Sequence, residues 1–383
     1  ALPILMTYVV PDIVKTFDQD KGALPWITVA LMKASDFIRV AWPFLLAGAA
    51  LGIFLLARFL RTAAGHYAFD RLTLKLPLFS RLSKGINAAR FASTLSILTK
   101  SGVPLVDALK TEMLTYPVLH ADETPVAMLD PGAGKTHRAY LWSYSIGAFE
   151  PVKAVVYDFA DSRAGKHARE FLGDWRGTLV CDDYAGYKAL IADGVTEAGC
   201  MAHARRKFFD LHANNQSLIA QQALIYIQKL YQVEREVAEL SPDERQRIRQ
   251  EQAKPILDEF HDWLTRHRLQ VPNGSSTAKA IDYSLKRWTA LAHYIGDGQV
   301  PIDNNWIENR IRPIATGRKN WLFAGSLRAG KRAAAIMSLI QSAKLNGHDP
   351  FVYLKDILSR LPTQPNSRIG ELLPHRWAPE SAA

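Results

Sequence analysis

Three acidic side chains stand where carboxylates can act on a substrate. Asp122 lies in Leu-His-Ala-Asp-Glu-Thr-Pro at the end of an apolar run, Asp182 ends the strand-like run Thr-Leu-Val-Cys-Asp, and Glu308 lies on an expected helix. Carboxylates at strand ends can hold hard divalent ions, and two such ions about 4 Å apart can activate an attacking oxygen and stabilise a leaving one. The alternative is that these acids cap turns and helices.

Basic side chains gather in two stretches, one of which follows Glu308 along the chain. The first is the run Arg205-Arg206-Lys207, and the second places cations beside Gly317 and an aromatic ring. Such a combination suits phosphate contacts and base stacking, and the alternative is a solvated basic loop. The candidate DNA-binding residues are Arg205, Arg206, Lys207, Arg312, Arg318, Lys319 and Trp321.

Cys200 and His203 have the two-residue spacing of half a zinc site. A structural zinc ion needs four ligands, and the only other cysteine, Cys181, lies next to an aspartate rather than in a second pair. A closed zinc site is therefore not expected. The alternative is a small buried thiol beside a hydrogen-bonded imidazole.

Two stretches imitate phosphate-binding loops but lack a required part. The stretch from Gly325 to Arg332 has the GxxxxGK spacing, with Arg332 where the magnesium-ligating hydroxyl belongs. The stretch that ends in Lys135 and Thr136 has Leu129 in place of the leading glycine. No nucleotide cofactor is expected.

Short strands followed by helices are expected to position these residues. Four β-type runs bounded by Gly, Pro or Asp cover residues 118–128, 139–149, 152–159 and 178–182. A helix over 162–175 separates the third run from the fourth, an order that indicates a mixed α/β sheet. From residue 202 onward the pattern is helical, and 216–268 is expected to be a helical insertion with one apolar face.

Composition places the chain among globular proteins, since 48% of its 383 residues are hydrophobic and 22% are charged. The formal net charge is +10, which taken alone would suggest a nucleic-acid binder. Residues 1–112, however, carry 13 Lys/Arg and 7 Asp/Glu, a net of +6, which leaves +4 for residues 113–383. The basic excess therefore lies mainly in the first third of the chain.

An uncharged stretch in that first third is long enough to cross a membrane. The 18 residues from Val40 to Ala57 contain no charge, and Arg58 and Arg61 follow directly. Because positive residues flank the cytoplasmic end of a span, we expect a transmembrane helix at about 40–57 in the inner membrane, with the following domain in the cytoplasm. The alternative is a buried core helix.

Six stretches between residues 118 and 377 resemble the catalytic half of insertion-sequence transposases of the IS66 family. They are HADETPV, FLGDWRGTLVCDDYAGY, EAGCMAHARRKFF, IDNNWIENRIRP, GRKNWLFAGS and AKLNGHDPFVYL. The resemblance implies a ribonuclease H-like fold and a metal-binding triad of Asp122, Asp182 and Glu308 that holds two Mg²⁺ or Mn²⁺ ions. It also implies cleavage and transfer of DNA strands, DNA ends and target DNA as partners, and a homo-oligomer. Family members have glycine after the second aspartate, and this chain has Asp183, so the second ligand is either Asp182 or Asp183.

The first part of the chain resembles an unrelated family. VVPDIVKTF, FLLARFLRTAAG, LKLPLFSRL and ARFASTLSILTKSGVPLVDAL are similar to the GspF-like inner-membrane platform protein of type II secretion and type IV pilus assembly. We therefore predict a mainly helical fragment over 1–112 and a transposase domain over 113–383. The expected function is a DDE transposase, impaired because the family's N-terminal DNA-binding region is missing. The alternatives are a remnant platform protein and an inactive chimeric gene product.

Overall fold

The computed structural model describes residues 26–60, 62, 104–321 and 323–379. The chain divides into two compact units, Ala1–Ala92 and Ser93–Ala383. A helix over 104–113 belongs to the second unit, because Leu105, Leu109 and Met113 are fully buried in its core. The division therefore lies before this helix, whereas the sequence predicted a boundary between residues 112 and 113.

The described part of the first unit is one helix, α3 (Trp26–Leu60), which contains Pro43. This helix begins well before the apolar stretch and so includes the charged residues Lys33 and Arg39. In the part of the chain that the structure describes, no helix combines the length and apolarity needed to span a membrane. The segment 40–57 is helical, as predicted, but the prediction that it spans a membrane is not supported.

The second unit is built on a five-stranded mixed sheet with the strand order β3-β2-β1-β4-β5. Its strands are β1 (Val118–Leu129), β2 (Thr136–Ile146), β3 (Val155–Ala160), β4 (Thr178–Val180) and β5 (Thr196–Ala198). The pairs β1–β2 and β2–β3 are antiparallel, and β1–β4 and β4–β5 are parallel. The predicted mixed α/β sheet is confirmed, and β5 is a strand that the sequence analysis did not anticipate.

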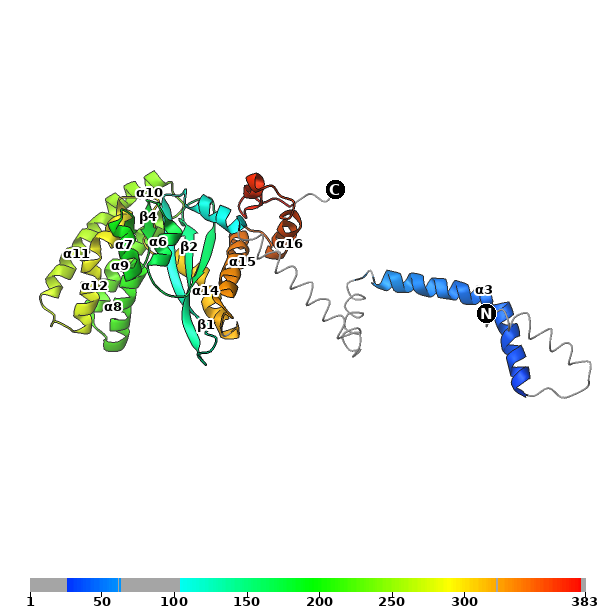
Figure 1. The fold of residues 1–383 in the computed structure, drawn as a ribbon. Helices are drawn as coiled ribbons and strands as arrows, with labels where there is room; N and C mark the ends of the chain where they lie inside the picture. The colour runs from blue at the N-terminus through cyan, green and yellow to red at the C-terminus, as the bar shows by residue number, and fades with distance from the viewer. Residues whose placement is uncertain (1–25, 61, 63–103, 322, 380–383) are drawn as a thin grey trace, which may run out of the picture. The chain divides into compact units, whose positions relative to one another are not determined.

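Helices surround this sheet. They are α6 (Lys166–Leu172), α7 (Lys188–Ala192), α8 (Met201–Asn215), α9 (Leu218–Glu236), α10 (Pro242–Ile248), α11 (Lys254–Arg268), α12 (Ser276–Lys286), α13 (Trp288–Ala292), α14 (Asn305–Trp321), α15 (Leu327–Leu345) and α16 (Pro350–Arg360). Figure 1 shows α8, α9, α11 and α12 grouped on one side of the sheet and α15 and α16 on the other. The segment 216–268 is helical, as expected from its apolar stripe, and includes a π-helical turn at Arg249–Ala253.

The free edge of β3 is covered by α15, which prevents it from pairing with another chain. The Ser338 hydroxyl accepts a hydrogen bond from the Tyr157 amide at 2.8 Å, and the Ser342 hydroxyl accepts one from the Val155 amide at 3.0 Å. Gly330 permits close packing here, since a Cβ at this position would lie 2.2 Å from the Phe159 ring. The sheet is thereby held against the helices that follow Glu308 in the chain.

Candidate active site

Asp122 lies on the central strand β1 among other carboxylates. Its Oδ1 accepts a hydrogen bond from the Glu123 amide at 2.9 Å. Burial, together with the negative charges of Glu123, Asp182 and Glu308, raises the pKa of Asp122 to about 8. The three predicted ligands are therefore close enough to interact electrostatically.

Asp182 lies two residues beyond the end of β4, beside the neighbouring strand β1 that carries Asp122. The parallel pairing aligns His120 with Val180, so each aspartate lies two residues beyond an aligned pair. The carboxylate of Asp182 accepts a hydrogen bond from the Tyr184 amide at 3.0 Å. Asp122 is not at a strand end, as the sequence suggested, because β1 continues to Leu129; the two aspartates come level because the parallel strand β4 is much shorter.

The neighbouring Asp183 is held by cations. Its Oδ1 lies 2.5 Å from Nη1 of Arg287 and 3.6 Å from Nζ of Lys188. Arg287 is almost fully buried and also lies 3.0 Å from Glu197. Of the two alternatives that the sequence left open, the geometry favours Asp182, because the charge of Asp183 is already compensated.

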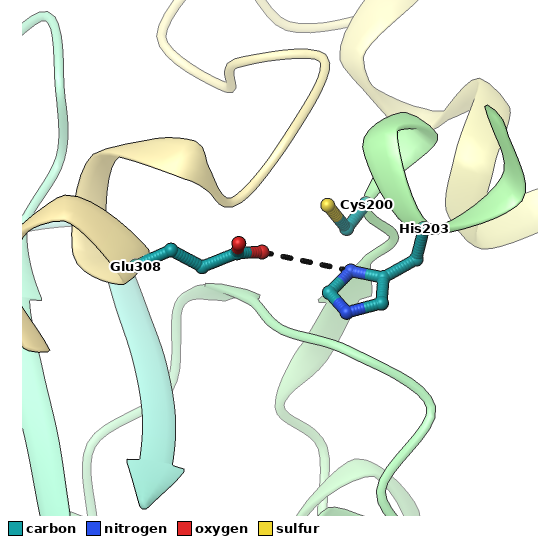
Figure 2. Close-up of side chains that lie close together, drawn as sticks. All are labelled: Cys200, His203 and Glu308. Carbon is teal, nitrogen blue, oxygen red and sulfur yellow. Dashed lines mark ion pairs between the residues drawn. The ribbon is translucent and has the colours of Figure 1, made fainter. Parts of the chain in front are cut away.

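Glu308 lies in the first turn of α14 and faces α8 (Figure 2). Its Oε1 is 3.7 Å from Nδ1 of His203, too long for a hydrogen bond, and both of these buried atoms lack a hydrogen-bond partner. Among the described residues, one set of potential metal ligands has its atoms within 4.8 Å of one another, and it is Cys200, His203 and Glu308. Asp122, Asp182 and Glu308 do not form such a set.

Cys200 is suited to a structural role. Its sulfur accepts a hydrogen bond from the Asn304 amide at 3.2 Å, and burial raises the pKa of the thiol to about 12. A metal ligand must be a thiolate, so this environment favours the neutral thiol. The interpretation of Cys200 as a small buried side chain agrees with the structure, whereas His203 lies beside Glu308 without a hydrogen bond to that carboxylate.

Asn304 joins the parts of the site and was not identified from the sequence. Its side-chain amide donates to the Ala121 carbonyl at 2.9 Å, and its Oδ1 lies 2.7 Å from Nδ1 of the buried His120. With the backbone contact to Cys200, one residue fixes β1, the start of α8 and the start of α14 relative to one another. The Asp-Asn-Asn sequence at the start of a predicted helix is the feature from which a structural role for Asn304 could have been predicted.

Glu123 is a fourth carboxylate that sequence reasoning missed. Its side chain is 1% exposed, and it accepts hydrogen bonds from Arg163 Nε at 2.8 Å and from the Tyr187 hydroxyl at 2.9 Å. Arg163 therefore neutralises Glu123. Within the described residues no comparable cation pairs with Asp122.

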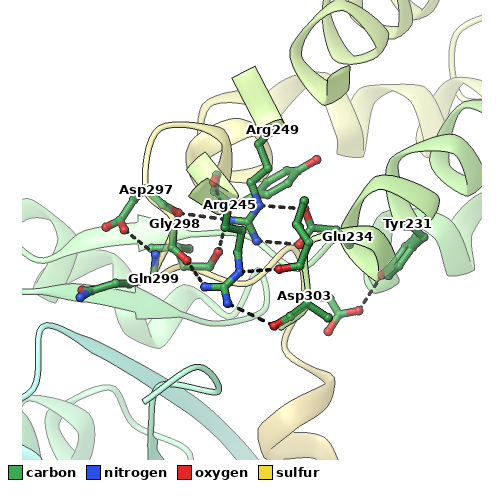
Figure 3. A network of polar contacts seen from close by, with 12 residues as sticks. Tyr231, Glu234, Arg245, Arg249, Asp297, Gly298, Gln299 and Asp303 are labelled. Carbon is green, nitrogen blue, oxygen red and sulfur yellow. Dashed lines mark hydrogen bonds and ion pairs between the residues drawn. The ribbon is translucent and has the colours of Figure 1, made fainter. Parts of the chain in front are cut away.

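A network of buried arginines holds the loop that leads into α14 (Figure 3). Arg249 is fully buried, forms a two-point ion pair with Glu234 at 2.8 and 2.6 Å, and donates to the carbonyls of Tyr294, Asp297 and Val300 at 2.9–3.0 Å. Arg245 donates to the Gly298 carbonyl at 2.5 Å. Because these arginines donate hydrogen bonds to the carbonyls of one loop, the insertion fixes the start of α14, the helix that carries Glu308.

The predicted DNA-binding residues fall into three groups. Arg205, Arg206, Lys207 and Arg312 are exposed, on α8 and α14. Arg318 is tied to β1, because its Nη1 donates to the Pro125 carbonyl at 2.7 Å and to the Thr124 hydroxyl at 3.2 Å. The side chains of Lys319 and Trp321 lie outside those that the structure describes.

Two protein families match the chain over most of the second unit. The Transposase IS66 family matches residues 79–332, and the IS66 C-terminal element matches residues 338–375. The chain belongs to the IS66 transposase family. The first match includes Asp122, Asp182 and Glu308, and it begins N-terminal of the start that the sequence predicted at residue 113.

Similar proteins are found in Sinorhizobium fredii (strain NBRC 101917 / NGR234). Uncharacterized protein y4hP is 33% identical over 343 residues, which cover 82% of this chain and 62% of that protein. Uncharacterized protein y4jD is 32% identical over 335 residues, 82% of this chain and 65% of that protein. This IS66 chain therefore spans less than two thirds of the length of these relatives.

A shorter similarity links the chain to a secretion protein. Type II secretion system protein F of Pseudomonas aeruginosa is 44% identical over 106 residues, which cover 27% of this chain and 26% of that protein. This similarity is partial, and the IS66 family is the one that covers most of the chain.

Proposed function

We propose that residues 113–383 are a DDE-type transposase domain with a ribonuclease H-like fold, in which Asp122, Asp182 and Glu308 hold two Mg²⁺ or Mn²⁺ ions. The observation that carries the proposal is the position of Asp122 on β1, where it is mostly buried beside the carboxylates of Glu123, Asp182 and Glu308; burial and then these negative charges raise its pKa, and a divalent cation would neutralise the charges. Transposases of the DDE type generally use divalent ions, and carboxylate oxygens are their preferred ligands. When bound, such ions activate an attacking oxygen and stabilise a leaving one during strand cleavage and transfer.

The chain's own residues do the positioning. The parallel pairing of β1 with β4 brings Asp122 and Asp182 level with each other, and Asn304 fixes the start of the helix that carries Glu308. Exposed Arg205 and Arg206 on α8 would neutralise DNA phosphates next to this site. The proposed partners are the DNA ends of the element and its target, with a homo-oligomer performing the reaction.

We propose that the domain acts where the DNA is, in the cytoplasm. The similarity to type II secretion protein F supports a second, narrower proposal. The segment that resembles it is a remnant of an inner-membrane platform protein without secretion activity of its own; the similarity covers 106 residues at 44% identity. Restoration of secretion in a strain that lacks its platform protein would contradict this.

The test is nicking of supercoiled plasmid by the full chain with Mg²⁺ or Mn²⁺. Asp122→Asn, Asp182→Asn and Glu308→Gln are expected to abolish nicking, since each removes a ligand charge without changing shape. Asp183→Asn is the matched control and should retain nicking, because this carboxylate is bound to Arg287 and Lys188. A single cooperative thermal unfolding transition in each variant shows that the variants fold. Loss of nicking in Asp183→Asn with retention in Asp182→Asn would reverse the assignment, and nicking by Asp122→Asn would refute the proposal.

A further inference from the structure

Helices α8 and α9 and the start of α14 line an open cavity of about 700 Å³. Among its lining residues are Arg205, Arg206 and Phe209 from α8, Tyr231 and Arg235 from α9, and Asn305 from α14. The cavity therefore combines the basic run of α8 with side chains from the helical insertion. Its volume is in the range that holds one small ligand.

Three arginines line the cavity and no aspartate or glutamate does. Within the described part of the chain, Arg205, Arg206 and Arg235 form no ion pair. The nearby carboxylate of Asp303 already accepts hydrogen bonds from the Tyr231 hydroxyl at 2.7 Å and the Asn305 amide at 3.0 Å. The lining of the cavity therefore carries net positive charge, which suits a ligand with phosphate groups.

An aromatic ring is available beside these cations. Phe209 is 48% exposed, and the guanidinium of Arg205 lies 5.6 Å from the centre of its ring. A large apolar ring left half exposed among arginines is a stacking surface for a base. A base inside a duplex has no free face to offer, so the ligand is an unpaired nucleotide.

The cavity adjoins the carboxylate site. Ala202, which lines it, precedes His203, and Asn305, which also lines it, is one helical turn before Glu308. His203 and Glu308 are 3.7 Å apart. A strand that places a phosphodiester at the carboxylates would bring an adjacent nucleotide to the mouth of the cavity.

We propose that this cavity binds one unpaired DNA nucleotide next to the phosphodiester that is cut, with its phosphates on Arg205, Arg206 and Arg235 and its base on Phe209. The inference rests on the proposed function and names the DNA feature that the same site recognises. It gives the insertion a direct role in binding DNA, where the sequence indicated only a packing role.

The test compares two DNA probes in EDTA, so that binding is measured without cleavage. One is a blunt duplex, and the other is the same duplex ending in a short unpaired tail that carries 2-aminopurine. The full chain is expected to bind the tailed probe about five- to a hundredfold more tightly, the range typical of base stacking on an aromatic ring, and to quench the 2-aminopurine fluorescence. Phe209→Ala should lose most of this gain, and Phe209→Trp should keep it.

Two further variants make the result specific. Arg235 is exposed, so the Arg235→Gln variant should fold normally. It should bind the unpaired tail more weakly. The slope of log K against log salt concentration should fall by about 0.7, the value expected for the loss of one phosphate contact. Phe351→Ala, on the distant α16, removes another exposed ring and should change nothing. Equal affinity of the unaltered chain for both probes, or an unchanged preference in both Phe209→Ala and Arg235→Gln, would overturn the inference. If the unaltered chain also fails to nick plasmid with Mg²⁺ or Mn²⁺, the proposed function is refuted as well. If it nicks plasmid but shows no preference for the tailed probe, only the nucleotide-binding role of the cavity is refuted.

Discussion

Neutralising Asp122 should stabilise the domain in the absence of divalent ions. The pKa of this carboxyl rises from 3.8 in the unfolded chain to about 8 in the folded one, so between these values the folded state binds more protons. Stability therefore falls as the pH rises through this window and reaches its lowest value above pH 8. A shift of about 4 pKa units at about 1.4 kcal/mol each gives a loss on the order of 5 kcal/mol.

The assay is thermal unfolding in EDTA at a series of pH values. The full chain should lose on the order of 10 °C in the unfolding midpoint of the second unit between pH 5 and pH 8, and Asp122→Asn should lose much less, because its amide does not titrate. At pH 8 the variant should therefore unfold at the higher temperature. Asp183→Asn, whose parent carboxylate is bound by cations, should follow the unaltered chain.

Added Mg²⁺ or Mn²⁺ should reverse the effect. A cation binds the ionised carboxylates, so it should raise the midpoint of the unaltered chain more at pH 8 than at pH 5, and by about 2.7 kcal/mol at a hundred times its dissociation constant. Asp122→Asn should respond weakly. A midpoint that does not differ between Asp122→Asn and the unaltered chain at pH 8, with or without Mg²⁺, would refute the reasoning.

Three other predictions concern the supports of the site. Arg249→Met should cost about 3–5 kcal/mol in urea unfolding, because it leaves the buried carboxylate of Glu234 and several loop carbonyls without a donor. Gly330→Ala should cost about 1–3 kcal/mol through overlap with the Phe159 ring, whereas Gly325→Ala, which has open space, should be neutral in the same measurement. Asn304→Ala should lower the rate of plasmid nicking at saturating DNA more than it lowers DNA affinity, since it misplaces the Glu308 helix without touching the basic residues; equal losses in both would contradict this.

The sequence was informative where function depends on local pattern. The sequence singled out Asp122 and Asp182 because each follows an apolar run, and the family resemblance then selected them as ligands; the parallel pairing of β1 with β4 brings the two residues level. The choice between Asp182 and Asp183 could not be made from the sequence, because it depends on Arg287, a residue 104 positions later in the chain. Strand β5 was missed because three residues carry no periodicity.

Contacts between distant segments account for the other omissions. Arg163 compensates Glu123 across 40 residues, and Asn304 reaches Ala121 across 183. The apolar stretch 40–57 is helical, as composition predicted, but the described residues do not support its identification as a membrane span. Residue type and spacing thus found the chemistry, and the supporting contacts needed the folded chain.

The buried Arg249 has a consequence for how this domain can be inherited. Its guanidinium belongs to the helical insertion, yet it binds carbonyls of Tyr294, Asp297 and Val300, in the loop that leads to Glu308. A deletion that removed the insertion cleanly would leave those carbonyls buried without donors and would release the helix that carries a triad residue. Recombination between related elements would meet the same constraint, because a crossover between Arg249 and this loop combines one parent's cation with another parent's backbone. Viable crossovers should therefore fall outside residues 216–308, and the insertion and the catalytic glutamate should pass between genes as one piece.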